Sequence, residues 1–313
     1  MVNVLFAALP MRWDQYETPL RKSFEDVGLD VELTPSNAPF DPAEIDYVIY
    51  APNSEIQDFT PFSRCKAVLN LWAGVEDIVG NETLTMPLTR MVDFGLTEGM
   101  IEWCTGHVLR HHLGMDAHIH GQDGVWRAGI VPPLARDRII TILGLGALGS
   151  AVGQALRALN FQVRGWSRSL KQVEGIACYA GDDGLSEALT GAEGVVLLLP
   201  NTPATENTLN ASTLSLLAEG AFIINPGRGP LIDDTALLEA LDSGQVGHAT
   251  LDVFRIEPLP AEHAFWSHPR VTVTPHIASE TRATSAAAVV AENIRRAEAG
   301  EPLLHRVDRK AGY

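Results

Sequence analysis

The sequence has few cysteines and few positive charges. Only Cys65, Cys104 and Cys178 occur in 313 residues, and no two of them form a CxxC pair. This usage predicts reduced, incidental thiols in a cytoplasmic protein. Lys and Arg number 23 against 39 Asp and Glu, so the formal net charge is −16, and no basic cluster interrupts it. Binding to nucleic acid or to an anionic membrane is therefore not expected.

Long apolar runs are also missing. No run approaches the roughly 20 residues that cross a bilayer, and the N-terminal run Val2 to Leu9 lacks the basic flank of a signal peptide. What remains is a chain of 313 residues that is 46% hydrophobic. Such a chain can bury two cores, so two domains are expected.

The most informative stretch begins with Ile139–Leu143, an apolar, β-branched run typical of a buried parallel strand. It continues into a GxGxxG pattern, Gly144, Gly146 and Gly149, and then into apolar residues at helical spacing. A dinucleotide-binding unit needs strand, glycine turn and helix in this order. The first glycine makes the turn, the second lets backbone approach a pyrophosphate, and the third packs helix on strand. The stretch therefore predicts a dinucleotide cofactor.

Two series of short apolar segments predict two parallel sheets. The first series has no glycine fingerprint and comprises Val2–Phe6, Val31–Leu33, Ile45–Tyr50 and Ala67–Leu71. The second surrounds the fingerprint and adds Phe161–Trp166, Gly194–Leu199, Ala221–Asn225, Ala249–Phe254 and Val271–Thr274. Strands that alternate with helices are typical of α/β folds. We therefore expect a Rossmann-type doubly wound parallel sheet joined to a smaller, flavodoxin-like parallel α/β domain.

Two helices and a long connection complete the outline. Thr97 is a suitable cap for a helix that reaches His112 and leads from the first domain to the second. A polar, turn-rich stretch with Trp126 follows from Gly114 to Asp137, and its length predicts a functional or interfacial role. An alanine-rich helix from Glu280 to Ala299 is expected to return the tail to the first domain.

The end of the second strand in the larger sheet indicates which cofactor binds. An NAD site usually places Asp or Glu there, on the ribose 2′-hydroxyl. Here the sequence reads Trp166, Ser167, Arg168 and Ser169, with no acid. A guanidinium suits a 2′-phosphate by charge and fork geometry. NADP(H) is therefore predicted, and NAD(H) is less favoured. The alternative is that Arg168 is a solvated surface residue and that no side chain contacts the 2′ position of the ribose.

Three polar residues that follow strands of this sheet suit carbonyl reduction. Reducing a 2-keto acid needs a cation for the carboxylate and carbonyl, and an acid that protonates the new alkoxide. Arg228 lies between two glycines after one strand, and His276 follows another. Histidine can give and retake a proton near neutral pH, and Glu257 could pair with the imidazole and stabilise its charged form. Taken singly, each has an ordinary structural explanation, so the prediction depends on their combination.

At this point the chain resembles the D-isomer-specific 2-hydroxyacid dehydrogenases, and within them a group that reduces glyoxylate and hydroxypyruvate. The resemblance covers nearly the whole chain. Besides the glycine fingerprint and the segment Trp166–Ser169, it is carried by Ala73–Val75, Leu199–Thr202, Asn225–Gly229, Leu251–Phe254, Glu257–Pro260, His268–Val271, Thr274–Ala278 and Val307–Arg309.

The resemblance implies an activity and its residues. The activity is NADPH-dependent reduction of small 2-keto acids to D-2-hydroxy acids, with Arg228, Glu257 and His276 as catalytic residues. The substrate contacts are expected at Trp72, Ala73, Gly74, Arg228 and His276. Beyond the three glycines and Trp166–Ser169, cofactor contacts are expected at Ala147, Leu148, Leu199, Pro200, Asn201, Thr205, Pro226, Gly227, Asp252 and Ala278.

The resemblance also implies a discontinuous domain arrangement. Residues 1–97 and 283–313 are expected to form a substrate-binding domain, and residues 98–282 a dinucleotide-binding domain. The partner is a small 2-keto or 2-hydroxy acid, and a homodimer is the expected assembly.

Other functions stay open on the sequence alone. Proteins of this fold include cofactor-sensing corepressors, and a dehydrogenase for a bulkier 2-keto acid would carry the same motifs. A metal site among His107, His111, His112, His118 and His120 is disfavoured because no HExxH or carboxylate partner accompanies them. We expect instead a solvated or interfacial histidine face, and no metal.

Overall fold

The structure, a computed structural model, describes residues 1–129 and 131–312 and divides into two compact units. Unit 1 comprises Met1–Leu96 and the C-terminal segment from Glu280, and unit 2 comprises Thr97–Ser279. No helix in the described parts of the chain is long and apolar enough to cross a membrane.

Unit 1 contains a five-stranded parallel sheet. Its strands are β1 (Val2–Ala7), β2 (Val31–Pro35), β3 (Tyr47–Tyr50), β4 (Ala67–Asn70) and β5 (Leu88–Thr89). Every neighbouring pair is parallel, and the spatial order is β2-β1-β3-β4-β5. This is the strand order of flavodoxin-like folds, so the prediction for the smaller domain is confirmed.

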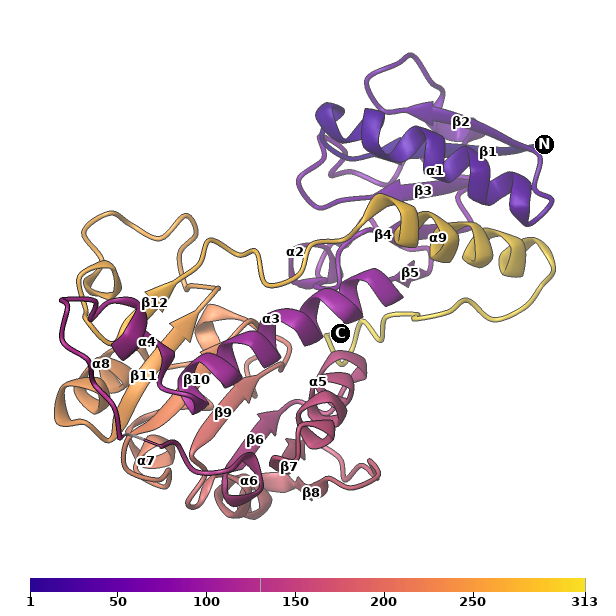
Figure 1. The fold of residues 1–313 in the computed structure, drawn as a ribbon. Helices are drawn as coiled ribbons and strands as arrows, with labels where there is room; N and C mark the ends of the chain where they lie inside the picture. The colour runs from indigo at the N-terminus through magenta and orange to yellow at the C-terminus, as the bar shows by residue number, and fades with distance from the viewer. Residues whose placement is uncertain (130, 313) are drawn as a thin grey trace. The chain divides into compact units, whose positions relative to one another are not determined.

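Helices from both ends of the chain cover one face of this sheet. Figure 1 shows α1 (Trp13–Asp26) and α9 (Ala283–Glu298) side by side in unit 1. They share one apolar cluster, in which Leu20 and Phe24 of α1 meet Val290 and Ile294 of α9. The opposite face carries a second cluster that includes Ile78 of α2 (Glu76–Val79). The tail thus completes the core of unit 1, as the alanine-rich pattern predicts.

Unit 2 contains a seven-stranded parallel sheet of order β12-β11-β10-β9-β6-β7-β8. The strands are β6 (Ile139–Leu143), β7 (Gln162–Ser167), β8 (Ala177–Ala180), β9 (Gly194–Leu197), β10 (Ala221–Asn225), β11 (Val246–Leu251) and β12 (Val271–Val273). Counted from β6, this is the doubly wound Rossmann order with one strand added. The order reverses between β6 and β9, and ligands bind beyond the carboxyl ends of strands at such a point.

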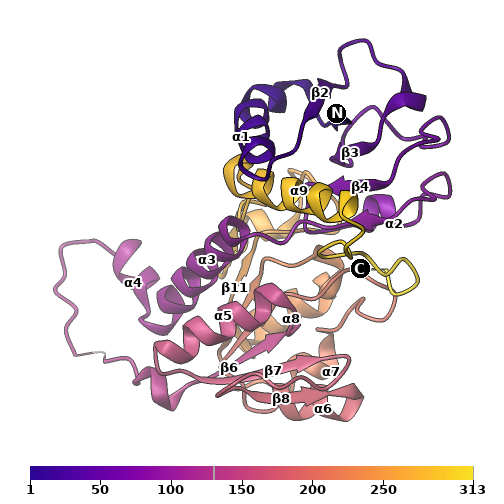
Figure 2. The same ribbon diagram turned by 90° about the vertical axis from the view of Figure 1, so that its right-hand side faces the viewer.

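Helices cover both faces of the larger sheet. The helices of unit 2 are α3 (Phe94–His112, from Thr97 onward), α4 (Met115–Ile119), α5 (Ala147–Ala158), α6 (Gly181–Leu189), α7 (Ala211–Leu214) and α8 (Asp234–Ser243). One apolar cluster joins α3 and α5 to the sheet, and another joins α6, α7 and α8 to its other face. Figure 2 shows α5 and α6 on opposite sides of β6 and β7.

Several details differ from the sequence-based outline. Strands β5 and β8 and helices α6 to α8 were not predicted, and the long connection after α3 contains α4. Thr97 does not cap α3: the helix begins at Phe94, because the Asp93 carboxylate accepts a hydrogen bond from the Leu96 N–H at 3.0 Å.

Candidate active site

The glycine turn after β6 has the geometry of a phosphate-binding loop. Gly144 has φ +108°, and a Cβ there would lie 2.5 Å from the Leu198 carbonyl oxygen. A Cβ on Gly149 would lie 1.8 Å from the Gly144 oxygen, so both positions require glycine. Gly146 faces open space and precedes α5, whose first turn contains Ala147 and Leu148. The backbone and helix N-terminus therefore fit a pyrophosphate.

The residues predicted to bind the 2′-phosphate at the end of β7 differ in their exposure. Arg168 and Ser169 are exposed just after the strand. Ser167 is buried and donates from Oγ to the Ser169 carbonyl at 2.8 Å. The Trp166 ring lies in the core, with its Nε1 donating to the Gly181 carbonyl at 2.8 Å. Only the backbone of Trp166 can therefore reach a cofactor, whereas Arg168 lies at the surface beyond the strand.

The other predicted cofactor residues line the same edge of the sheet. A Cβ on Gly227 would lie 2.8 Å from the Leu197 carbonyl oxygen, so the turn after β10 packs tightly on β9. The Thr205 hydroxyl donates to the Pro200 carbonyl at 2.7 Å and fixes the loop after β9. Further members at this edge are Leu199, Asn201, Pro226, Asp252 and Ala278, of which all but Asn201 are buried.

His276 and Glu257 form a hydrogen-bonded pair beyond β11 and β12. Nδ1 of His276 lies 2.8 Å from Oε2 of Glu257, and the Phe254 N–H donates to Oε1 at 2.9 Å. The side chains are 53% and 36% exposed, so solvent reaches both. Nε2 of His276 makes no hydrogen bond to any residue that the structure describes, which leaves this atom for a ligand.

The two partners shift each other's proton affinity. The hydrogen bond to Glu257 raises the pKa of His276 above its usual value, although partial burial and the charge of Arg228 act the other way. Burial alone would raise the pKa of Glu257, but the hydrogen bonds from His276 and Phe254, with the nearby positive charges, hold it below its usual range. The pair therefore favours a protonated imidazole on a carboxylate.

A buried carboxylate fixes the backbone that carries His276. Asp252 is fully buried and accepts hydrogen bonds from the Thr274 hydroxyl and from the N–H groups of Ile277 and Ala278, at 2.6, 2.9 and 2.8 Å. His276 itself has φ +56°, a left-handed conformation that costs free energy for a non-glycine residue. The three bonds to Asp252 hold this turn in place. Sequence reasoning assigned Asp252 to the cofactor and missed this role.

Arg228 lies in a tight turn after β10. Its Nη1 donates to the Gly227 carbonyl at 2.7 Å, and the Asn225 side chain donates to the Arg228 carbonyl at 3.0 Å. A Cβ on Gly229 would lie 2.0 Å from the Phe254 carbonyl carbon. The loop of Arg228 and the loop that leads to Glu257 are therefore in direct backbone contact, which requires glycine at position 229.

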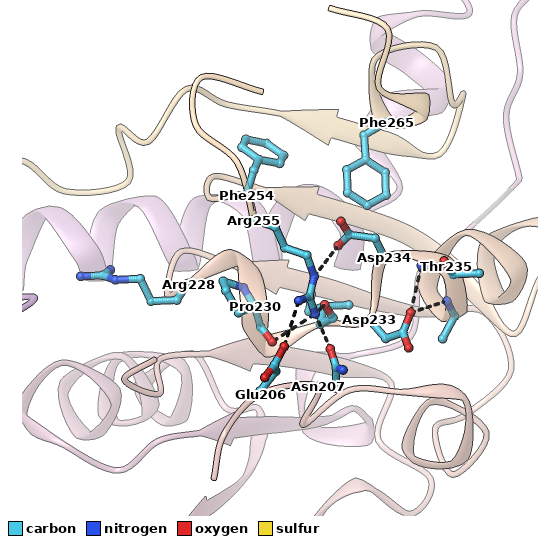
Figure 3. Close-up of polar contacts among 12 residues, drawn as sticks. Glu206, Asn207, Arg228, Pro230, Asp233, Asp234, Thr235, Phe254, Arg255 and Phe265 are labelled. Atoms are coloured by element: carbon cyan, nitrogen blue, oxygen red, sulfur yellow. Dashed lines mark hydrogen bonds and ion pairs between the residues drawn. The ribbon is translucent and has the colours of Figure 1, made fainter. Parts of the chain in front are cut away.

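A second arginine, which sequence reasoning missed, ties these loops together. Arg255 donates to the Ile232 carbonyl at 2.6 Å, bonds the Asn207 side chain and contacts the Glu206 carboxylate at 3.3 Å. Figure 3 shows Glu206, Asn207 and Asp234 gathered around its guanidinium, whereas Arg228 extends away from them. Arg255 thus joins the segment before Glu257 to the loops after β9 and β10. No local pattern marks such a residue, because its partners are distant in sequence.

The predicted substrate loop follows β4 in unit 1. The Asn70 side chain donates to the carbonyls of Trp72 and Gly74, at 3.0 and 2.9 Å. The N–H groups of Trp72, Ala73 and Gly74 donate to no acceptor among residues 1–129 and 131–312. The Trp72 side chain is 38% exposed. The loop therefore holds its carbonyls inward and leaves three successive amides for an anion.

Of the expected solvated or interfacial histidine face on α3, the solvated alternative is wrong for His111 and His112. His112 is 6% exposed, and the His111 ring packs 4.7 Å from the His248 ring of β11. Burial lowers the pKa of His111 to about 3 and that of His248 to about 4. Candidate ligand atoms of His111, His248 and Asp116 lie within 4.8 Å of one another. Nε of Arg110 lies 2.6 Å from Asp116, so a positive charge already occupies this cluster.

Taken together, the doubly wound sheet, its glycine turn and the Arg–Glu–His set beyond its strands define an NAD(P)-binding dehydrogenase. The model of the "D-isomer specific 2-hydroxyacid dehydrogenase, NAD binding domain" matches residues 106–278. The chain belongs to this family, and the resemblance predicted from its motifs is confirmed.

Known relatives cover nearly the whole chain. A glyoxylate/hydroxypyruvate reductase A from Serratia proteamaculans is 42% identical over 259 residues, 80% of this chain and 82% of its own. A D-isomer specific 2-hydroxyacid dehydrogenase from Xanthobacter autotrophicus, solved with NADPH and MES, has TM-score 0.93 and 38% identity, covering 100% of this chain and 99% of its own. An NADPH-dependent glyoxylate/hydroxypyruvate reductase from Sinorhizobium meliloti, solved with NADP and sulfate, has TM-score 0.88 and 33% identity over the full length of both.

Proposed function

We propose that this chain uses NADPH to reduce small 2-keto acids, glyoxylate and hydroxypyruvate, to 2-hydroxy acids, which have D configuration where the product is chiral. The observation that carries the proposal is the 2.8 Å pair of His276 and Glu257 beyond the strand ends, in the same unit as Arg228 and the glycine turn. The relatives from Serratia and Sinorhizobium support the choice of substrates.

In this proposal unit 2 binds the dinucleotide, and the amide loop of unit 1 contributes to binding of the substrate. A reduced nicotinamide held in unit 2 supplies the hydride for the keto carbon. The pyrophosphate is held by backbone at Gly146 and by the N-terminus of α5. Arg168, exposed after β7 where an NAD site carries an acid, binds the 2′-phosphate. The relatives solved with NADPH and NADP support this cofactor preference.

His276 acts as the general acid in reduction. Its imidazole is protonated at Nε2 and held by Glu257 at Nδ1, so it can give a proton to the keto oxygen as negative charge develops there. Glu257 stabilises the imidazolium and sets the ring orientation. Arg228 binds the carboxylate and carbonyl and stabilises the charge on that oxygen. In the reverse direction neutral His276 takes the proton back.

A steady-state panel tests this function. Five 2-keto acids (glyoxylate, hydroxypyruvate, pyruvate, 2-ketobutyrate and phenylpyruvate) are assayed with NADPH and with NADH. We expect the highest kcat/KM for glyoxylate or hydroxypyruvate with NADPH, and D-glycerate from hydroxypyruvate on a chiral column. Preference for phenylpyruvate would show that the chain serves a bulkier acid, and absence of turnover with every pair would refute the proposal.

We further propose a homodimer formed through the connection after α3. Apolar side chains on this segment are strongly exposed: Ile119 57%, Val125 62%, Trp126 93%, Val131 86% and Leu134 64%. So many exposed apolar side chains in one segment are unusual for a monomeric protein, and a second copy of the chain would cover them. Light scattering should report a dimer whose dissociation constant rises in Trp126→Ser. A monomeric wild type would refute this assembly.

The cytoplasmic location stays a prediction from cysteine usage.

A further inference from the structure

Arg90 lies at the carboxyl end of β5, next to the amide loop of unit 1. Its N–H donates to the His305 carbonyl at 3.0 Å, and the following N–H, of Met91, donates to the Trp72 carbonyl at 3.0 Å. The backbone around Arg90 is therefore held between the C-terminal tail and the Trp72–Gly74 loop.

The alternation of side chains places Arg90 on the same face of the sheet as Asn70. Leu88 packs in the cluster of Val68, whereas Met91 packs in the opposite cluster. Because successive side chains of an extended chain point to opposite faces, Arg90 shares the face of Leu88, and Asn70 shares that of Val68. Asn70 is the residue whose amide holds the Trp72 and Gly74 carbonyls. The Arg90 side chain thus begins beside that loop.

The guanidinium of Arg90 makes no hydrogen bond or ion pair with any residue in the described ranges. It is only partly exposed, and burial, with no carboxylate acting against it, lowers its pKa below the usual value. The titratable group beside it is His305, whose pKa is lowered by burial and by the charge of Arg90. A partly desolvated cation without a partner costs free energy, which an anionic ligand would recover.

Two independent features therefore converge on one anion in unit 1. One is the run of three amides at Trp72, Ala73 and Gly74, and the other is the guanidinium of Arg90, whose side chain begins beside that loop. Neither has a hydrogen-bonding partner among the described residues. We infer that Arg90 is an anion-binding residue of the keto-acid site, which holds the substrate carboxylate together with the amides of the Trp72–Gly74 loop. The inference rests on the proposed function and adds Arg90 to the residues proposed to bind the substrate.

The test compares Arg90→Met and Arg90→Gln, which remove the charge, with Arg90→Lys, which keeps it. Arg21→Met, an exposed arginine on α1 in the same unit, is the matched control. For each, KM for glyoxylate, KM for NADPH, the inhibition constant of oxamate and the melting temperature are measured. Oxamate carries the carboxylate but no reducible keto group, and calorimetry follows its binding without turnover.

We expect Arg90→Met to raise KM for glyoxylate and the oxamate constant roughly 10- to 150-fold, the effect of one lost charge-assisted hydrogen bond. KM for NADPH should stay at the wild-type value. Arg90→Lys should recover part of the lost affinity because lysine keeps the positive charge but lacks the planar, two-pronged donor geometry of the guanidinium. If Arg90→Met melts below the assay temperature, Arg90→Gln gives the result instead.

Two outcomes would overturn the inference. One is a folded, uncharged variant with wild-type KM and oxamate affinity. The other is a loss confined to a dicarboxylate such as oxaloacetate, because Arg90 would then serve a second carboxylate. If the wild type reduced no keto acid, the proposed function would fail. Oxamate calorimetry would still show whether Arg90 binds a carboxylate.

Discussion

Glu257→Gln tests most directly whether the pair beyond β11 and β12 controls the catalytic proton. Gln keeps an oxygen that can accept from Nδ1 of His276 but removes the negative charge. Opposite charges 2.8 Å apart attract by roughly 1.5 kcal/mol even at the dielectric constant of water. Water is the suitable reference, because both side chains are more than a third exposed. The equilibrium constant for protonating the imidazole should therefore fall roughly tenfold in this variant.

The proposed role of His276 as the general acid determines the sign of the pH effect. Glu257 raises the pKa of His276, so the charged imidazole persists to higher pH in the wild type. Keto-acid reduction needs that proton and loses rate as pH rises through the pKa. In Glu257→Gln the basic limb of the kcat/KM profile should move to lower pH, with roughly tenfold lower activity on that limb.

The assay is a pH–rate profile for NADPH-dependent reduction of glyoxylate, measured in parallel for wild type, Glu257→Gln and Glu262→Gln. Glu262 is an exposed acid in the same segment and serves as the control. Its profile should match the wild type. A Glu257→Gln profile with the basic limb in its wild-type position would refute the coupling, whatever the loss of overall rate.

Three further variants test the remaining assignments. Arg168→Ala should raise KM for NADPH roughly 10- to 150-fold, by loss of one charge-assisted contact, and leave NADH unchanged; an equal loss with both cofactors would remove Arg168 from the 2′-phosphate. His276→Ala should lower turnover by about 10²–10⁴ with unchanged NADPH affinity by fluorescence titration; near-normal turnover would exclude it as the acid. Arg255→Met, which frees the loops around Glu206 and Ile232, should lower kcat by up to roughly 10²-fold, and wild-type kcat would show that these loops need no such tie.

The repeated strand–helix pattern was enough to predict the two parallel sheets, because buried strands are apolar runs that local sequence reveals. Strand β5, with two residues, is too short to show a pattern. Strand β8 has four residues, lies at the edge of the sheet and has no fully buried residue, so it shows no long apolar run. Thr97 is a suitable cap in isolation, but the Asp93 carboxylate three residues before Leu96 begins the helix earlier.

The residues of the candidate site could be predicted where a chemically suitable side chain directly follows a strand. They could not be predicted where tertiary contacts determine the role of the residue. Arg228, Glu257 and His276 follow strands of one sheet, which the sequence reveals. The roles of Asp252 and Arg255 depend on backbone groups that only the folded loops bring near them. His111 was expected on a solvated or interfacial face because its partners, Thr250 and His248, lie more than 130 positions along the chain.

The shared packing of α1 and α9 sets an order of events during synthesis. Unit 2 is a continuous segment ending at Ser279, whereas the core of unit 1 includes Val290 and Ile294. At about 5–20 residues per second, roughly 15–55 s separate the first strand of unit 1 from its last helix. During that interval Leu20 and Phe24 have no α9 to pack against. Unit 2 can therefore form its core from one continuous segment, whereas the core of unit 1 stays incomplete until its final helix has been synthesised.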